Sequence, residues 1–201
     1  MKKSEPAMQS TKNYLLDHVL YEMEMYLYTY TLIHQASFGD QLLFNSIWNS
    51  HNVALRNLMS FFGISGQRGK DEIVYNDFSF SEKPANRKCR QQYYSPLSKA
   101  INHIAVDRFL GYNGKKLDDV VIQAREALFP EMSKYIQLFI HHLEAEQNIT
   151  YQYEVGGKRH VVDISTELAD IRVQRMIATV KQLDGVCSSI PQCNSTQPAT
   201  P

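Results

Sequence analysis

The amino-acid sequence predicts a mainly α-helical protein: a bundle of five or six helices with one small β-hairpin near residues 149–164. Two observations lead to this fold class. Apolar residues recur at three- and four-residue steps along most of the chain, which is the spacing of one helix face. The exception is a pair of β-prone runs separated by Gly156 and Gly157, a two-residue connection typical of a hairpin.

The first two helices are predicted by clear apolar stripes. The stripe of residues 13–36 comprises Leu16, Leu20, Met23, Leu27, Tyr30 and His34. Asp40 is a favourable N-cap for a second helix, which Gly63 closes as a C-cap. The second stripe comprises Phe44, Ile47, His51, Ala54, Leu58 and Phe61. Because His51 lies inside this stripe, we expect a core histidine with one backbone partner rather than a ligand.

Local signals also predict the later helices. Ser95 and Pro96 begin a helix that ends at Gly111. Another helix begins near Asp118 and should end or kink before Pro130, where a new helix starts. Ser165 is expected to cap the last helix.

Composition indicates a cytoplasmic protein with one domain over residues 1–185 and a disordered tail over 186–201. The tail has almost no apolar content, so we expect it to be dispensable for folding. Neither a secretory signal nor an apolar run of about 18 residues occurs, so no membrane span is predicted. The 21 basic and 21 acidic residues balance, which provides no global attraction to nucleic acid. Cys89, Cys187 and Cys193 are too few for a disulfide framework.

A connection over residues 64–95 lacks helical periodicity and is far longer than usual. It carries a basic cluster followed by Tyr93 and Tyr94. The cluster comprises Lys83, Arg87, Lys88 and Arg90. Such residues could hold phosphate and stack a base, which makes the residue 83–94 loop a candidate for RNA or nucleotide binding. A solvated surface loop is the alternative.

Two polar groups are candidates for catalysis. Lys99, His103 and Asp107 share one helix face, where a carboxylate one turn away can orient an imidazole. A helix surface with ordinary charge pairs has the same pattern, and we expect His103 to be buried, hydrogen-bonded and structural. Arg56 and Asn57 form the second group, and we expect Arg56 and His103 to share a partner.

A metal site is a weaker hypothesis. His18 and Glu22 stand one turn apart, as do His142 and Glu146, but the Glu-x-x-His motif of metal-binding bundles is missing. No further ligands can be named, so the sequence predicts neither a metal nor another cofactor.

Three segments together resemble an uncharacterised family of small bacterial helical proteins. They are the helix around Arg56-Asn57-Leu-Met-Ser-Phe-Phe62, the loop Asp71-Glu-Ile-Val-Tyr-Asn-Asp-Phe78, and the helix from Leu97 to Phe109. The positions that match the family pattern are Arg56, Asn57, Asp71, Asp77, Phe78, Lys99, His103 and Arg108, with Asp107 in place of a glutamate. Ala54 replaces the family's histidine and Asn49 its frequent glutamate. The resemblance supports the helical fold and implies no particular reaction.

A looser similarity is to the HEPN superfamily, many of whose members are RNases of toxin and antiviral systems. In those RNases four to six residues separate an arginine from a histidine, and at the corresponding positions after Arg56 this chain has Phe61, Phe62 and Gly63. We therefore predict a non-enzymatic interaction module that binds an unknown protein or a second copy of itself. A HEPN-like RNase or nucleotide-binding protein is the alternative, with Arg56, Asn57, His103 and Asp107 as its site, and a metal-binding bundle is third.

Overall fold

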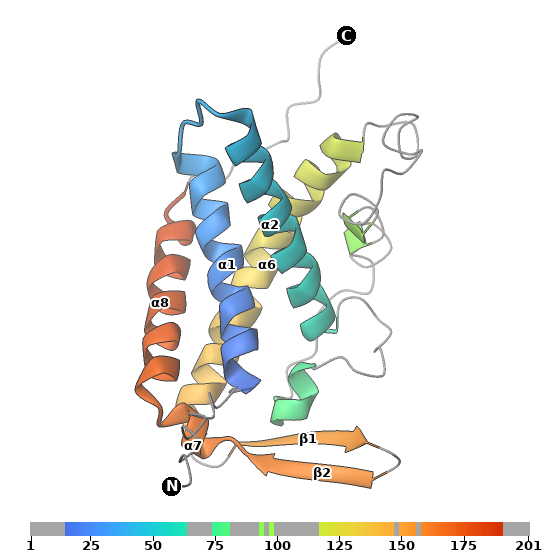
Figure 1. Ribbon diagram of the computed structural model, residues 1–201, viewed down its shortest axis with the longest axis vertical. Coiled ribbons are helices and arrows are strands. Elements are labelled where there is room, and N and C mark those ends of the chain that lie inside the picture. Colours follow the sequence, from blue (N-terminus) through green and yellow to red (C-terminus); the bar gives the residue numbers. More distant parts are fainter. Residues whose placement is uncertain are drawn as a thin grey trace, which may run out of the picture.

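The computed structural model describes residues 15–63, 74–80, 93–94, 97–98, 117–146, 149–155 and 158–190. Within these ranges the protein is mainly helical and carries one two-stranded antiparallel sheet, as predicted. Helix α1 (Leu15–Gln35) lies between α2 (Gln41–Phe61) and α8 (Ile171–Ser188), and α6 (Leu117–Ala145) passes behind them (Figure 1). The hairpin of β1 (Thr150–Val155) and β2 (Lys158–Asp163) crosses the lower end of the bundle.

Helices α1 and α2 follow the predicted stripes. The face of α1 from Leu16 to Tyr30 is buried, and α2 buries the residues from His51 to Phe61 that point to the core. Asp40 caps α2 by accepting hydrogen bonds from the backbone N–H groups of Leu42 and Leu43, at 2.7 and 3.2 Å. Gly63 adopts a φ of 73° directly after the helix, which favours glycine at this position.

Helix α6 corrects one prediction, because it continues through Pro130 as a single helix. Pro130 cannot donate a hydrogen bond to the carbonyl group of residue 126. The proline lies on the exposed side of α6, where water can solvate that carbonyl group. The opposite side is one continuous apolar face that includes Val121, Leu128, Met132 and Phe139, so burial on both sides of the proline holds the helix together.

The predicted hairpin is confirmed, with Thr150 opposite Asp163 and Val155 opposite Lys158. Its base is anchored in the core, where Ile149 and Ile164 are buried and Tyr151 packs against Phe78 with ring centroids 5.4 Å apart. Phe78 belongs to a 3₁₀ helix, η1 (Tyr75–Phe78), inside the connection for which no helical periodicity was found. The six residues of β2 are exposed, so only the base of the hairpin belongs to the core.

The predicted start of the last helix is wrong. Ser165 begins only the single turn of α7 (Ser165–Leu168). Its backbone N–H donates a hydrogen bond to the carboxylate of Asp163 at 2.8 Å. The cap of α8 is Asp170, whose carboxylate accepts the N–H of Arg172 at 2.8 Å. An aspartate five residues further along therefore begins the long helix, after a break in the chain direction at residues 169–170.

Helix α8 also corrects the predicted domain boundary, since it passes through Gly185 and ends at Ser188. Cys187 is buried, and its thiol donates to the carbonyl oxygen of Leu27 at 3.2 Å. Ile190 packs partly against the core. Residues 186–190 thus belong to the folded domain. The rest of the predicted tail, residues 191–201, lies outside the described residues. The predicted helix of residues 95–111 also lies outside them, apart from positions 97 and 98.

No helix of the described ranges combines the length and the apolar character that crossing a membrane requires.

Candidate functional site

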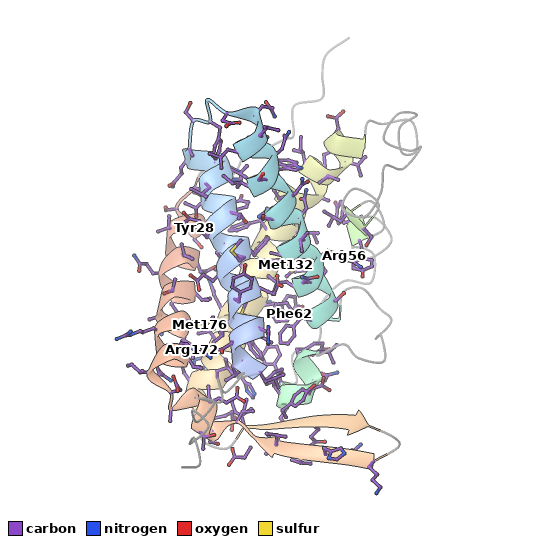
Figure 2. The ribbon with its side chains drawn as sticks, in the orientation of Figure 1. Tyr28, Arg56, Phe62, Met132, Arg172 and Met176 are labelled. Carbon is purple, nitrogen blue, oxygen red and sulfur yellow. The ribbon has the colours of Figure 1, made fainter. Side chains whose placement is uncertain are left out.

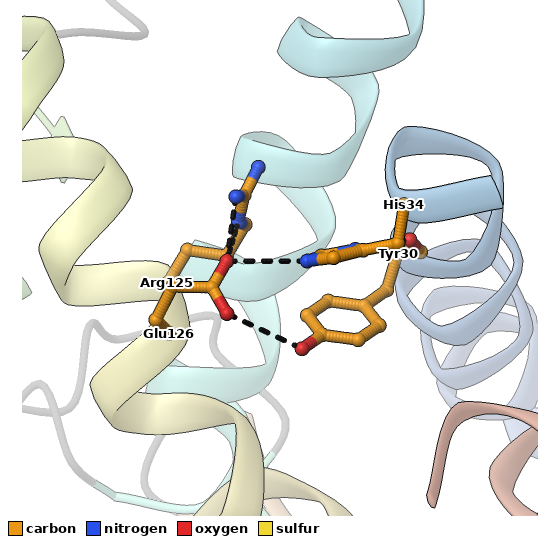
Figure 3. A network of polar contacts seen from close by, with 4 residues as sticks. All are labelled: Tyr30, His34, Arg125 and Glu126. Atoms are coloured by element: carbon orange, nitrogen blue, oxygen red, sulfur yellow. Dashed lines mark hydrogen bonds and ion pairs between the residues drawn. The ribbon is translucent and has the colours of Figure 1, made fainter. Parts of the chain in front are cut away.

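A polar network joins α1 to α6 inside the upper half of the bundle (Figure 3). Glu126 lies at its centre. One carboxylate oxygen accepts hydrogen bonds from Nε and Nη2 of Arg125, at 2.8 and 2.5 Å. The same oxygen lies 3.3 Å from Nε2 of His34. The other oxygen accepts from the hydroxyl of Tyr30 at 3.4 Å. The guanidinium of Arg125 also stacks over Trp48 at 4.7 Å, which extends the network to α2.

The contacts of this network define its charges. Burial alone would raise the pKa of Glu126, but the hydrogen bond from His34 and the charge of Arg125 lower it to about 2. His34 faces an acceptor at each ring nitrogen, since Nδ1 lies 2.8 Å from the carbonyl oxygen of Tyr30. Burial and the Glu126 carboxylate raise the pKa of Tyr30, so its phenol stays protonated.

His51 lies in the core next to this network, fully buried and stacked on Tyr26 with ring centroids 5.0 Å apart. The prediction of a core histidine is confirmed, and Nδ1 lies 3.0 Å from the hydroxyl of Thr29. That hydroxyl donates its proton to the carbonyl oxygen of Met25 at 2.5 Å, so it accepts from Nδ1–H of His51. Burial and the charge of Arg125 lower the pKa of His51 to about 3, so the ring is neutral near pH 7.

The network is suited to holding helices together rather than to proton transfer. Both oxygens of Glu126 are engaged by three side chains, so this carboxylate is not free to act as a general base. Because Arg125, Glu126 and Trp48 connect α6 with α1 and α2, the contacts fix the relative positions of three helices. Burial raises the pKa of the Cys187 thiol, which makes it a poor nucleophile.

A groove of about 340 Å³ lies between α6 and α8. Its buried acid, Asp184, accepts hydrogen bonds from Ser133 and Gln137, both at 2.5 Å. Lys181 and Glu144 form an exposed ion pair at its edge, at 2.8 Å. These polar groups therefore contact one another across the two helices.

The structure separates the two predicted site residues that it describes. Asn57 donates to Glu22 of α1 at 3.0 Å, whereas Arg56 extends from the flank of α2 that faces away from α1 (Figure 2). The adjacent side chains do not converge on one site. The remaining predicted site residues lie outside the described residues; they are His103, Asp107, Lys83, Arg87, Lys88 and Arg90. The expected contact between Arg56 and His103 therefore stays a prediction.

Comparisons of the chain with known protein families, with curated proteins and with solved structures find no match. The resemblance to small bacterial helical proteins and to the HEPN superfamily stays a prediction. The structure describes two of the matching positions in the loop that carries this resemblance. The carboxylate of Asp77 accepts a hydrogen bond from the N–H of Val74 at 3.0 Å, and Phe78 is fully buried.

The residues considered for a metal also have other partners. Glu22 accepts from Asn57, and Nε2 of His142 lies 2.9 Å from the carbonyl oxygen of Phe78. Across the described ranges, no three His, Cys, Asp or Glu side chains lie close enough together to hold a metal ion.

Sequence reasoning did not identify the network around Glu126, although one signal was available. Arg125 lies on the buried stripe of α6 with Val121, Leu128 and Met132, and a charged residue at such a position is expected to be paired. The identity of its partners on α1 and α2 depends on tertiary packing, because Tyr30 and Glu126 are 96 positions apart.

The outward side of α2 has different properties, because it is exposed and carries no charge. We call its side chains the α2 outer face; they are Leu42, Asn45, Ser46, Asn49 and Val53, all exposed. Leu42 and Val53 expose 77% and 39% of their surface. Residues 41–55 contain no Asp, Glu, Lys or Arg. An exposed helix surface normally carries charged residues, so this face is atypical of a surface that stays in water.

Proposed function

We propose that the chain is a non-enzymatic interaction module of the cytoplasm that binds another protein through the α2 outer face. The observation that carries this proposal is the uncharged composition of residues 41–55 on a helix whose outward side chains are exposed. Depletion of charge is characteristic of the central part of protein interfaces, where charged groups would have to lose their water. The buried free thiol of Cys187 is compatible with the reducing cytoplasm.

Two polar side chains of the face, Asn45 and Ser46, support this function, because they form hydrogen bonds within α2. The amide of Gln41 donates to Asn45 at 2.9 Å. The hydroxyls of Ser46 and Ser50 donate to the carbonyl oxygens of Leu42 and Ser46, each at 2.9 Å. A partner that covers Asn45 and Ser46 therefore leaves these hydrogen bonds intact, and the small side chain of Ser46 allows the partner's backbone to approach closely.

The buried network adds rigidity to the same surface. Trp48 and His51 point inward from the helix that presents the face, and they contact Arg125 and Tyr26 on the neighbouring helices. A surface that is already held in its binding conformation loses less conformational entropy when a partner binds.

Photo-crosslinking in living cells tests the proposal. A photoreactive amino acid at Ser46 should give protein adducts in high yield, because the partner covers this position. The matched control is Ala178, an exposed small residue on α8 between Arg175 and Lys181. Equal or greater yield from Ala178 would contradict the proposed docking face.

Neither alternative function is favoured by the described residues. The HEPN-like nuclease needs Arg56 and Asn57 to act together, but Asn57 contacts Glu22 on the other side of α2. His103, Asp107 and the residue 83–94 loop, apart from Tyr93 and Tyr94, lie outside the described ranges.

A further inference from the structure

We infer that the α2 outer face binds a second copy of this chain, with the two α2 helices antiparallel. This inference rests on the proposed function and adds the identity of the partner. Three features of α2 carry it: the spacing of the exposed residues, the two charges that flank the uncharged run, and the net charge of the whole chain.

The spacing of the face is the same in both directions along the helix. Leu42, Ser46, Asn49 and Val53 follow one another at steps of four, three and four residues. Steps of this kind keep one narrow seam facing a neighbouring helix. When two copies pair antiparallel about the midpoint between residues 47 and 48, Leu42 of each meets Val53 of the other. Ser46 then meets Asn49. The apolar side chains fall at both ends of the seam and the small polar ones at its centre, so the face is complementary to itself, as a two-fold symmetric interface requires.

The flanking charges select the same orientation. Asp40 directly precedes the uncharged run and Arg56 directly follows it. In the antiparallel pair, Asp40 of each copy lies beside Arg56 of the other, whereas a parallel pair places like charges together. Asp40 is exposed and Arg56 is half-buried, and within the described part of the chain no acidic side chain pairs with Arg56. Opposite charges at both ends favour the antiparallel register.

The net charge of the protein does not oppose the association. The chain has 21 basic and 21 acidic residues, so two copies approach without overall repulsion. A seam formed by one helix from each copy is at the small end of stable interfaces, so we expect a reversible dimer that depends on concentration.

Sedimentation velocity of the purified full chain over a range of concentrations tests the inference. The average mass should rise from the monomer value of 23.2 kDa toward twice that value. Arg56→Glu should weaken the dimer by roughly tenfold or more, because it places like charges beside Asp40 of the second copy. Asp40→Asn removes the charge and keeps a side-chain cap for α2, so it should weaken the dimer as well.

Ser46→Lys, at an exposed position near the two-fold axis, should also weaken the dimer, whereas Ala178→Lys on α8 should not. Circular dichroism of each variant checks that the helices are retained. A chain that stays monomeric at several hundred micromolar, or a dimer that is insensitive to the α2 substitutions, would overturn the inference. Adducts from Ser46 to a different protein would in that case leave the proposed function intact, whereas equal yields from Ser46 and Ala178 would remove both.

Discussion

At the scale of single residues, this protein places charged and polar side chains where their protonation states are strongly perturbed. His51 is neutral in the core and Glu126 is ionised in a half-buried network, and the charge of Arg125 contributes to both outcomes. The same guanidinium therefore opposes protonation of a histidine on α2 and stabilises the carboxylate beside it on α6. Acid should destabilise the fold through both groups.

The first prediction concerns the effect of His51 on stability between pH 6.5 and 4.5. Below pH 6.5 the histidine binds a proton in the unfolded chain, but in the folded protein it stays neutral until about pH 3. The free energy of unfolding should therefore fall with decreasing pH, by about 1.4 kcal/mol per unit from this residue. Glu126 adds a fall of the same sign only below its ordinary pKa of 4.5.

Urea unfolding at several pH values measures this slope. His51→Gln should flatten it, since glutamine does not titrate. The groups that face His51 are Tyr26, Tyr30 and His34 on α1 and Arg125 and Glu126 on α6, and all are retained in the variant. His141→Gln, on the exposed side of α6, is the control for replacing a histidine outside the core. A His51→Gln variant with the wild-type slope would show that His51 is accessible to protons in the folded state.

The second prediction is that Glu126→Gln destabilises the protein by about 2 to 3 kcal/mol, because it leaves the guanidinium of Arg125 poorly compensated in the interior. The matched control is Glu144→Gln, which removes the exposed ion pair with Lys181 and should cost less than about 1 kcal/mol. Chemical denaturation of both variants measures the difference. Equal costs would mean that the network is as solvated as the surface pair.

At the scale of helices and strands, local sequence patterns predicted an element correctly wherever a single signal determined it. The stripe of α1, the Asp40 cap of α2 and the Gly-Gly hairpin were all predicted. The prediction failed where burial overrode a local rule, as at Pro130, whose helix continues because both of its halves share one buried face. It also failed where neighbouring caps competed, since Asp170 rather than Ser165 begins α8. The contacts of Glu126 with Tyr30 and His34 could not be predicted, because these residues lie far from it in sequence and meet it only in the folded bundle.

The third prediction concerns the end of α8. A chain that stops after residue 190 should keep its melting temperature within a few degrees, because the structure through Ile190 is retained. A chain that stops after Gly185 loses buried Cys187 and half-buried Ile190, and should be destabilised by about 2 kcal/mol or more. Thermal unfolding of the two truncated chains measures the difference. If the folded domain ended at Gly185, both truncations would leave the melting temperature unchanged.

At the scale of the whole molecule, the bundle exposes apolar side chains in several places. Besides Leu42 and Leu43 of α2, they include Tyr21 and Tyr28 of α1, Val161 of β2, and Ile171 of α8. Isolated apolar residues on a surface are ordinary, and these other positions stand on elements that also carry charged residues. The α2 outer face differs because its apolar residues lie within an uncharged run. We therefore predict that α2, rather than the hairpin or α8, is the surface that other molecules contact.

The most direct test is a photo-crosslinking scan of the exposed positions in living cells. The same photoreactive residue is placed in turn at Ser46, Asn49, Tyr28, Val161 and Ile171. We predict that adducts concentrate at the two α2 positions and are weak at the other three. A strongest adduct at Val161 or Ile171, with none at Ser46 or Asn49, would contradict the central claim and assign the interaction surface to the hairpin or to the start of α8.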